Sequence, residues 1–181
     1  MSLIKVKGSS ITGSLPAIDG SALTGLSGGI THADIWDLSS TQTVSSGLQT
    51  FTAWQRQTSR NRTPEGSAMT ESSGLFTFPT TGKWLISANF YTDGYQSTHY
   101  VGVILRNGND ENLQISYSQA KGSNPSWEHA YLNVQTFLDV TDTTSNDCKV
   151  YFKTDAGGAR TWGGHASNGK SCALFIRLMD T

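Results

Sequence analysis

Five segments of the chain alternate apolar and polar side chains with a period of two, which is the period of a pleated strand. The five segments are 84–91, 101–105, 132–140, 148–152 and 174–178. Turn-forming residues separate them, for example at Pro79–Gly82, Asp93-Gly94 and Asn107–Asp110. No stretch carries the stripe of an amphipathic helix. Without helices to make parallel crossovers, the pattern predicts an all-β fold, namely an antiparallel jelly-roll sandwich.

Three of the predicted strands, 84–91, 131–140 and 172–179, are apolar on much of both faces. One face would fill a core, and the other is predicted to be an interface. The residues assigned to that interface are Leu85, Tyr91, Tyr131, Phe137 and Phe175. If the three strands share a sheet, its outer surface is an apolar patch that a soluble monomer rarely exposes. The pattern therefore predicts self-association.

Residues 1–30 differ in composition from the rest, since they are dense in Gly and Ser and contain no aromatic residue. We predict an extended arm over 1–30, followed by a strand-rich head over 31–181. The aliphatic residues predicted to dock the arm are Ile4, Val6, Ile11, Leu15, Leu23 and Leu26. Each exposed aliphatic forgoes roughly 1.5–3 kcal/mol of burial, so we expect them to pack on another protein or another copy of the chain. A tethering linker is the alternative.

Charge and hydropathy exclude several partners. The net charge is −1 and the basic residues are scattered, which argues against a nucleic-acid partner. No run approaches the roughly 18 apolar residues of a membrane span, and the first residues lack the apolar run of a signal peptide. We therefore expect synthesis in a cytosol and a soluble protein. Cys148 and Cys172 are predicted to be free thiols that point inward.

No catalytic motif is present, so no enzymatic activity, no cofactor and no metal are predicted. The four histidines lie in different segments, without the spacing of a helical zinc pair. The acids considered as calcium ligands at predicted turns are Asp110, Glu111, Asp139, Asp142 and Asp147; solvated turn acids are the favoured interpretation. Trp162, flanked by Gly163 and Gly164, is the predicted ligand-contact residue on the surface.

Residues 73–84, with the sequence SGLFTFPTTGKW, fit the pattern Gly-x-Phe-x-x-Pro-x-x-Gly-x-aromatic. This pattern resembles the signature of the complement globular-head and tumour-necrosis-factor (TNF) superfamily, with Trp84 where the family usually has Tyr. The likeness continues to the closing strand at 171–179, although the family's Gly-Asp turn is absent at 142–147. The resemblance implies a TNF-like jelly roll that assembles as a tight homotrimer through one sheet.

The segment 15–26, LPAIDGSALTGL, is similar to short Gly/Ser/Leu segments of bacteriophage fibre and virion proteins, especially those of phages that infect cyanobacteria. Together with a trimeric head it implies a virion structural protein, made in the host bacterial cytoplasm and anchored to capsid or tail proteins by its arm. A capsid decoration (cement) protein or a short fibre fits this length. The alternative is a fibre head that binds a host-surface receptor or glycan and mediates attachment.

Overall fold

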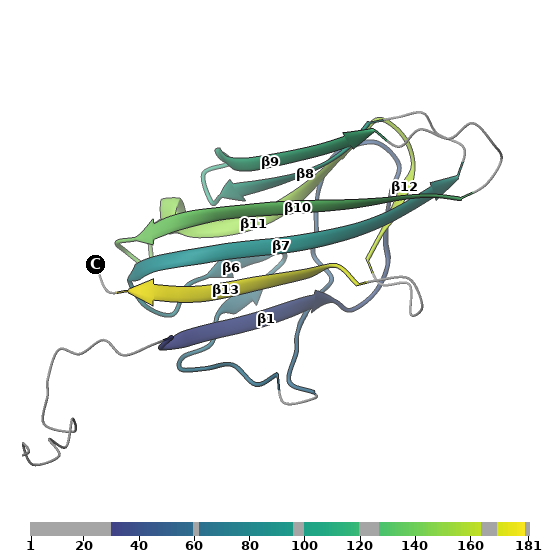
Figure 1. Cartoon of the computed structure of the whole chain (residues 1–181). Helices are drawn as coiled ribbons and strands as arrows, with labels where there is room; N and C mark the ends of the chain where they lie inside the picture. The colour runs from purple at the N-terminus through teal and green to yellow at the C-terminus, as the bar shows by residue number, and fades with distance from the viewer. Residues whose placement is uncertain (1–29, 60–61, 96–99, 120–126, 164–169, 180–181) are drawn as a thin grey trace, which may run out of the picture.

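The fold was established from a computed structural model that describes residues 30–59, 62–95, 100–119, 127–163 and 170–179. Within these ranges the chain forms two antiparallel sheets packed face to face (Figure 1), and it contains no α-helix there. The prediction of an all-β antiparallel sandwich is confirmed. The predicted arm lies outside the described residues except for its last residue, Ile30.

The first sheet, called the β7 sheet, is built around β7 (Gly82–Tyr95). Its spatial order is β2 (Gln42–Val44), β12 (Arg160–Trp162), β7, β13 (Cys172–Met179), β1 (His32–Leu38) and β4 (Trp54–Arg56), with β10 (Trp127–Val140) on the other edge of β7. β10 pairs with β7 along the full length of both strands. The strands β10, β7, β13 and β1 thus lie side by side and share one outer surface.

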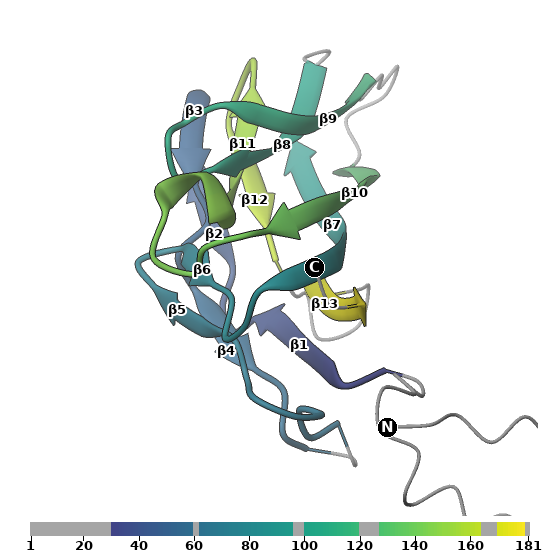
Figure 2. The ribbon, with the colours of Figure 1, turned by 90° about the vertical axis from the view of Figure 1, so that its left-hand side faces the viewer.

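The second sheet, called the β11 sheet, is built around β11 (Lys149–Ala156). Its spatial order is β5 (Thr70–Ser72), β6 (Leu75–Thr77), β11, β8 (Tyr100–Asn107) and β9 (Asn112–Gln119), with β3 (Gly47–Thr50) also paired to β11. Figure 2 shows β3, β11, β8 and β9 in one layer and β7, β13 and β1 in the other. The outer faces of the two sheets therefore lie on opposite sides of the molecule.

Each of the five predicted strand segments lies in a strand, namely β7, β8, β10, β11 or β13. Only Cys148 falls outside, in the 3-10 turn Asn146–Cys148 that precedes β11. The predicted turn at Asp93-Gly94 is wrong, because both residues belong to β7 and pair with β10. A continuous ladder between two long strands here overrides the turn preference of the Asp-Gly pair.

The core between the sheets is dominated by aromatic rings. The ring of Trp54 lies with its centroid 5.4 Å from that of Phe76 and 5.5 Å from that of Phe152, so it joins the two layers. The buried aromatic side chains of this cluster are Trp36, Phe51, Trp54, Phe76, Phe78, Trp84, Phe90, Phe152, Trp162 and Phe175. Edge-to-face contacts of this kind add to the free energy of area burial.

The Gly-x-Phe-x-x-Pro-x-x-Gly-x-aromatic segment has a structural explanation. Gly74 adopts a φ of +91°, and a Cβ there would lie 2.4 Å from the carbonyl oxygen of Phe51. Gly82 adopts a φ of +133° at the start of β7. Phe76 and Trp84 are buried in the core, and the Trp84 indole donates to the carbonyl of Thr80 at 3.2 Å. The glycines thus shape two turns that place two core aromatics.

A buried carboxylate ties β1 to the segment between β4 and β5. The side chain of Asp34 is 3% exposed. Its Oδ2 accepts hydrogen bonds from Trp36 Nε1 at 3.1 Å, Arg56 Nε at 3.1 Å and the Met69 amide at 3.0 Å. The Arg56 guanidinium also donates to the Met69 carbonyl and lies 4.6 Å from the centroid of the Trp36 ring. The Asp34–Arg56 pair therefore links β1, β4 and the segment that contains Met69.

Candidate assembly surface

The candidate functional site is the outer face of the β7 sheet. Strand pairing places Phe137 opposite Leu85, Leu85 opposite Ile176, and Ile176 opposite Ala33. Their neighbours of the other parity, such as Trp84, are buried in the core, so this set points outward. A row of four apolar side chains therefore crosses β10, β7, β13 and β1.

The neighbouring rows on this face are more polar. Asn133 lies opposite Asn89, and its side-chain amide donates to Asn89 Oδ1 at 3.0 Å and to the Ala88 carbonyl at 3.1 Å. Lys83 and Asp139 form an exposed ion pair at 2.9 Å near the start of β7. An apolar surface that carries fixed polar groups favours one docking geometry over others.

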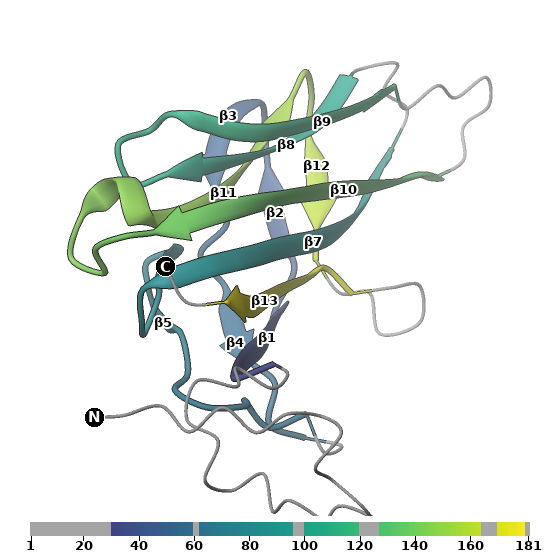
Figure 3. The same cartoon turned by 60° about the vertical axis from the view of Figure 1, so that its left-hand side comes forward.

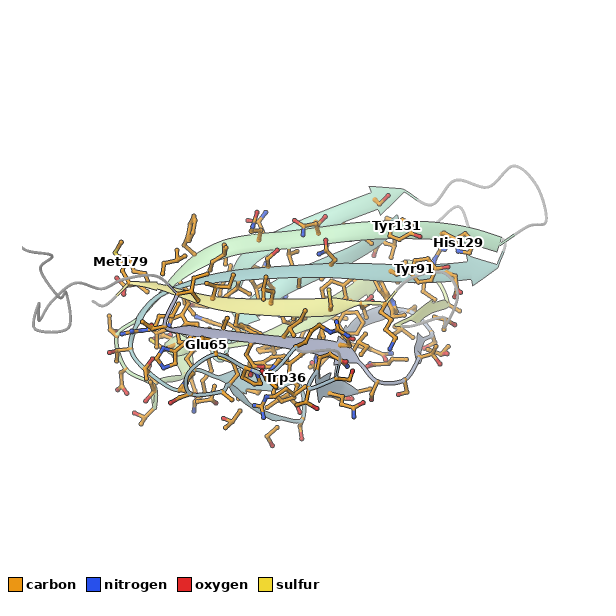
Figure 4. The ribbon with its side chains drawn as sticks, turned by 60° about the horizontal axis from the view of Figure 1, so that its bottom comes forward. Trp36, Glu65, Tyr91, His129, Tyr131 and Met179 are labelled. Carbon is orange, nitrogen blue, oxygen red and sulfur yellow. The ribbon has the colours of Figure 1, made fainter. Side chains whose placement is uncertain are left out.

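A cluster of aromatic side chains, formed by Tyr91, His129 and Tyr131, lies at the end of this face opposite to Met179 (Figure 4). The rings of Tyr91 and His129 are stacked with centroids 5.5 Å apart, and the Tyr91 hydroxyl lies 2.6 Å from His129 Nδ1. The ring of Tyr131 lies 5.2 Å from that of Tyr91. These contacts bury Tyr91 and leave Tyr131 on the surface.

The single chain leaves large side chains of this face in solvent. Tyr131 is 70% exposed and Phe137 is 71% exposed. Leu178 and Met179, at the end of β13, are about half exposed. Leu85, Leu174 and Ile176 are half-buried among them. Aromatic side chains of this size dominate the energetics of interfaces when a partner covers them.

Four of the five predicted interface residues lie on this face, and Phe175 does not. Phe175 is fully buried, with its ring centroid 4.9 Å from that of Phe76 and 6.0 Å from that of Phe78. β13 is apolar at both parities, so alternation alone does not tell its inner face from its outer face. The structure reverses the predicted assignment: Ala173 and Phe175 point inward, and Leu174 and Ile176 point outward.

The prediction that Trp162 contacts a ligand on the surface is also wrong. Trp162 is fully buried in β12, with its ring centroid 5.3 Å from that of Phe51 and 6.4 Å from that of Phe90. The flanking Gly163 has a φ of +113° and packs against the backbone at Ser40. The glycine marks a close approach of two backbone segments rather than an exposed loop.

Both cysteines are free thiols. Cys148 is buried, as predicted, but Cys172 lies on the outer face of the β7 sheet with Leu174 and is half-buried. Burial raises the pKa of the Cys172 thiol, and the charge of Asp37 acts in the same direction. Little reactive thiolate is therefore present on Cys172 at neutral pH.

We expect two alkyl adducts when the denatured, non-reduced chain is treated with iodoacetamide, because neither thiol is engaged in a disulfide. The native protein should show much slower labelling, since Cys148 is inaccessible and the Cys172 thiol is protonated. Intact-mass spectrometry counts the adducts. A denatured chain that takes up no adduct would contain a disulfide and contradict this expectation.

The outer face of the β11 sheet carries a polar cluster around Asp110. Its Oδ1 accepts from Arg106 at 2.6 Å, from Lys153 at 2.8 Å and from the Tyr151 hydroxyl. These hydrogen bonds, with that from Lys153 the largest contribution, hold the pKa of Asp110 well below its usual range. Asp110 is thus paired with cations of its own sheet, in keeping with the favoured interpretation of a turn acid.

The described part of the chain contains no group of three or more His, Cys, Asp or Glu side chains arranged to hold a metal ion. No helix within the same ranges has the length and apolar character required to cross a membrane.

Solved structures share this arrangement of strands. Eiger TNF from S. frugiperda matches with a TM-score of 0.59 at 15% identity, over 84% of this chain and 96% of that chain. Murine APRIL matches with a TM-score of 0.55 at 11% identity, over 81% of this chain and 98% of that chain. The chain has a TNF-like jelly-roll fold. The resemblance noted at residues 73–84 is confirmed at the level of fold.

The vertex protein P5 of the phage PRD1 has the same jelly-roll fold, with a TM-score of 0.52 at 12% identity. The match covers 84% of this chain and all of the P5 chain. No protein-family model matches the chain, and no curated protein sequence is similar to it.

Proposed function

We propose that the chain is a structural protein of a bacteriophage particle, with a homotrimeric jelly-roll head and an N-terminal arm that anchors it to capsid or tail proteins. The observation that carries the proposal is the outer face of the β7 sheet, where Tyr131 and Phe137 stand exposed beside half-buried Leu85 and Ile176. A soluble protein covers such a face with a partner. The partner proposed is a second and third copy of the same chain.

Self-association suits this face better than a different partner does. In a closed ring of three copies, the same contact between two complementary regions recurs at every subunit, and the face here combines apolar side chains with fixed polar groups such as the Asn89–Asn133 pair. The resemblance to the TNF-like superfamily implies three copies. The fold that the head shares with the PRD1 vertex protein supports a place on a virion. A decoration or short-fibre role requires no catalytic group.

The arm would begin where the assembly surface ends. β1 runs antiparallel to β13, with His32 opposite Arg177, so the chain enters the head beside Leu178 and Met179. Thr31 accepts a hydrogen bond from Arg177 at 3.3 Å, which fixes the entry point on the head. In a homotrimer, three arms would leave from equivalent points and could bind one particle together, which strengthens attachment by multivalency.

Replacing the six arm aliphatics by serine tests the anchoring role. The substituted residues are Ile4, Val6, Ile11, Leu15, Leu23 and Leu26. We expect the variant to be lost from purified particles, because burial contributes on the order of 0.8 kcal/mol per methylene, while the head still folds and assembles. Copy number per particle, measured by quantitative mass spectrometry, reports the loss. Retention at the wild-type copy number would contradict docking and move attachment to the head.

A matched control replaces the Gly and Ser residues between the aliphatics by other small polar residues. The docking hypothesis predicts that this control keeps the wild-type copy number. If the arm is only a tether, both variants should stay on the particle, because flexible polar linkers of equal length are interchangeable.

A further inference from the structure

A second surface of the head has the composition of a ligand site. Tyr100, Tyr117, Ser118 and Asp155 line a hollow of about 500 Å³. This volume lies in the range typical of small-molecule sites. The lining residues come from β8, β9 and β11, which lie side by side in the β11 sheet (Figure 3), and Tyr117 and Asp155 point to the outer side of this sheet.

The strand register explains how the hollow is built. Gly102 in β8 lies opposite Tyr117 in β9 on one side and opposite Asp155 in β11 on the other. A Cβ at Gly102 would lie 2.3 Å from Tyr117 Cε1. Because that position is a glycine, the Tyr117 ring can extend across β8, and its hydroxyl donates to Asp155 Oδ2 at 2.8 Å. Three residues in one row thus form a fixed aromatic platform.

The Tyr117 hydroxyl is held in its protonated form. Burial raises the pKa of Tyr117, and the hydrogen bond to Asp155 acts in the same direction. The phenol therefore keeps its proton and goes on donating to the carboxylate. This bond limits rotation of the ring, so little side-chain entropy remains to be lost when a ligand stacks on it.

Tyr100 supplies a second aromatic surface. Its ring centroid lies 6.0 Å from that of Tyr117, with an angle of 70° between the ring planes. Tyr100 is 48% exposed and Tyr117 is 53% exposed. About half of each side chain is therefore accessible to a ligand. Two exposed tyrosines therefore lie at a steep angle to each other beside a carboxylate, in an open hollow that combines apolar rings with a polar group.

We propose that this hollow binds a neutral pyranose unit of a glycan. A pyranose ring has an apolar face of C–H groups, which would stack on the exposed face of Tyr117, and a rim of hydroxyl groups, which would donate to the Asp155 carboxylate. The negative charge of Asp155 disfavours phosphate, sulfate and acidic sugars. The proposal goes beyond the structural role, since it gives the head a recognition function at a place far from the assembly surface.

The position of the hollow suits multivalent binding. The outer face of the β11 sheet lies on the side of the sandwich opposite to the proposed interface, so a homotrimer leaves all its hollows in solvent. Single sugars bind such open sites weakly, but several equivalent sites on one particle raise the apparent affinity by orders of magnitude.

Saturation-transfer NMR on the full chain tests the site. The probes are the methyl glycosides of glucose, galactose, mannose and N-acetylglucosamine, each at millimolar concentration, with choline chloride as a cationic probe. We expect saturation transfer to at least one glycoside, strongest at the C–H protons of one ring face. Transfer to choline alone, or to no probe, would overturn the proposal.

Variants locate the binding. Tyr117→Ala should weaken glycoside binding about tenfold or more, which corresponds to about 1.4 kcal/mol. Gly102→Ala, which displaces the ring without removing it, should have a similar effect, and Tyr117→Phe should keep most of the stacking. Ile115→Ala, on the same face but outside the hollow, is the control and should bind as the wild type does. Equal binding by Tyr117→Ala and the wild type would overturn the assignment.

Circular dichroism and solution mass check that each variant folds and assembles as the wild type does. Each variant is compared only if its spectrum and mass equal those of the wild type, and Asp155→Asn provides a second route to the same site if Tyr117→Ala fails to fold. Loss of glycoside binding with unchanged mass separates this site from the assembly surface. Loss of assembly with unchanged glycoside binding separates them in the other direction.

Discussion

Replacing Tyr131 and Phe137 together by lysine should convert a trimer into a folded monomer. Both side chains are about 70% exposed in the single chain, so their loss costs the isolated head little. In the assembly each would be buried, where a large apolar side chain contributes roughly 1.5–3 kcal/mol, and the effect recurs in every protomer. The introduced lysines also place like charges close to one another in the interface.

Light scattering measures the mass of this double variant, and circular dichroism checks that the strands remain. Ile115→Lys is the control: it places one lysine on a partly exposed apolar position of the β11 sheet. The control should keep the mass of the wild type. If the double variant assembles as the wild type does, the outer face of the β7 sheet is not the interface.

Asp34→Ala should lower the free energy of unfolding by about 3 kcal/mol, because removal of one partner from a buried charge pair leaves the other charge uncompensated. This loss lies at the lower end of the range usual for breaking a buried charge pair, because the Arg56 side chain is 30% exposed and can turn towards water. The Met69 amide and the Trp36 indole also lose their acceptor. Urea unfolding at one fixed protein concentration measures the change, since assembly links stability to concentration.

Glu65→Ala is the control for this measurement. Glu65 lies on the segment that Asp34 ties to β1, and its side chain is exposed. We expect a change within about 0.5 kcal/mol, as for most surface substitutions. If Asp34→Ala is no more destabilising than Glu65→Ala, the buried pair contributes nothing net to stability.

The sequence identified those parts of the fold that rest on local patterns. Strand alternation located β7, β8, β10, β11 and β13, because one face of each is buried and the period of two is visible in the residue types. The short strands β2, β4 and β12 have three residues each, too few to show a period. They form because they pair with longer neighbouring strands. The residues of a three-residue segment do not reveal such tertiary context.

The errors at Phe175 and Trp162 share one cause. An apolar residue in a strand that is apolar at both parities, or beside glycines, has no local signal for the direction in which it points. Pairing decides it: Phe175 lies opposite Ile86 of β7, which is buried in the core. In β7, Ser87 and Asn89 mark the outer face, and this assignment could have been carried across the ladder to β13 if the register had been known.

The hollow on the β11 sheet was beyond sequence reasoning for the same physical reason. Its platform depends on Tyr117, Gly102 and Asp155 lying in one row across three strands, and their separation along the chain gives no hint of that row. The only local signal was a glycine inside the alternating segment 101–105. An interior glycine in a strand marks the close approach of another group, which here is the Tyr117 ring.

The mass of the purified full-length chain in solution tests the central claim most directly. Size-exclusion chromatography with multi-angle light scattering, carried out over a dilution series into the low micromolar range, should give three times the chain mass of 19.5 kDa throughout. Assembly through the outer face of the β7 sheet predicts that this value is independent of dilution. A stable mass of 19.5 kDa would contradict the homotrimer.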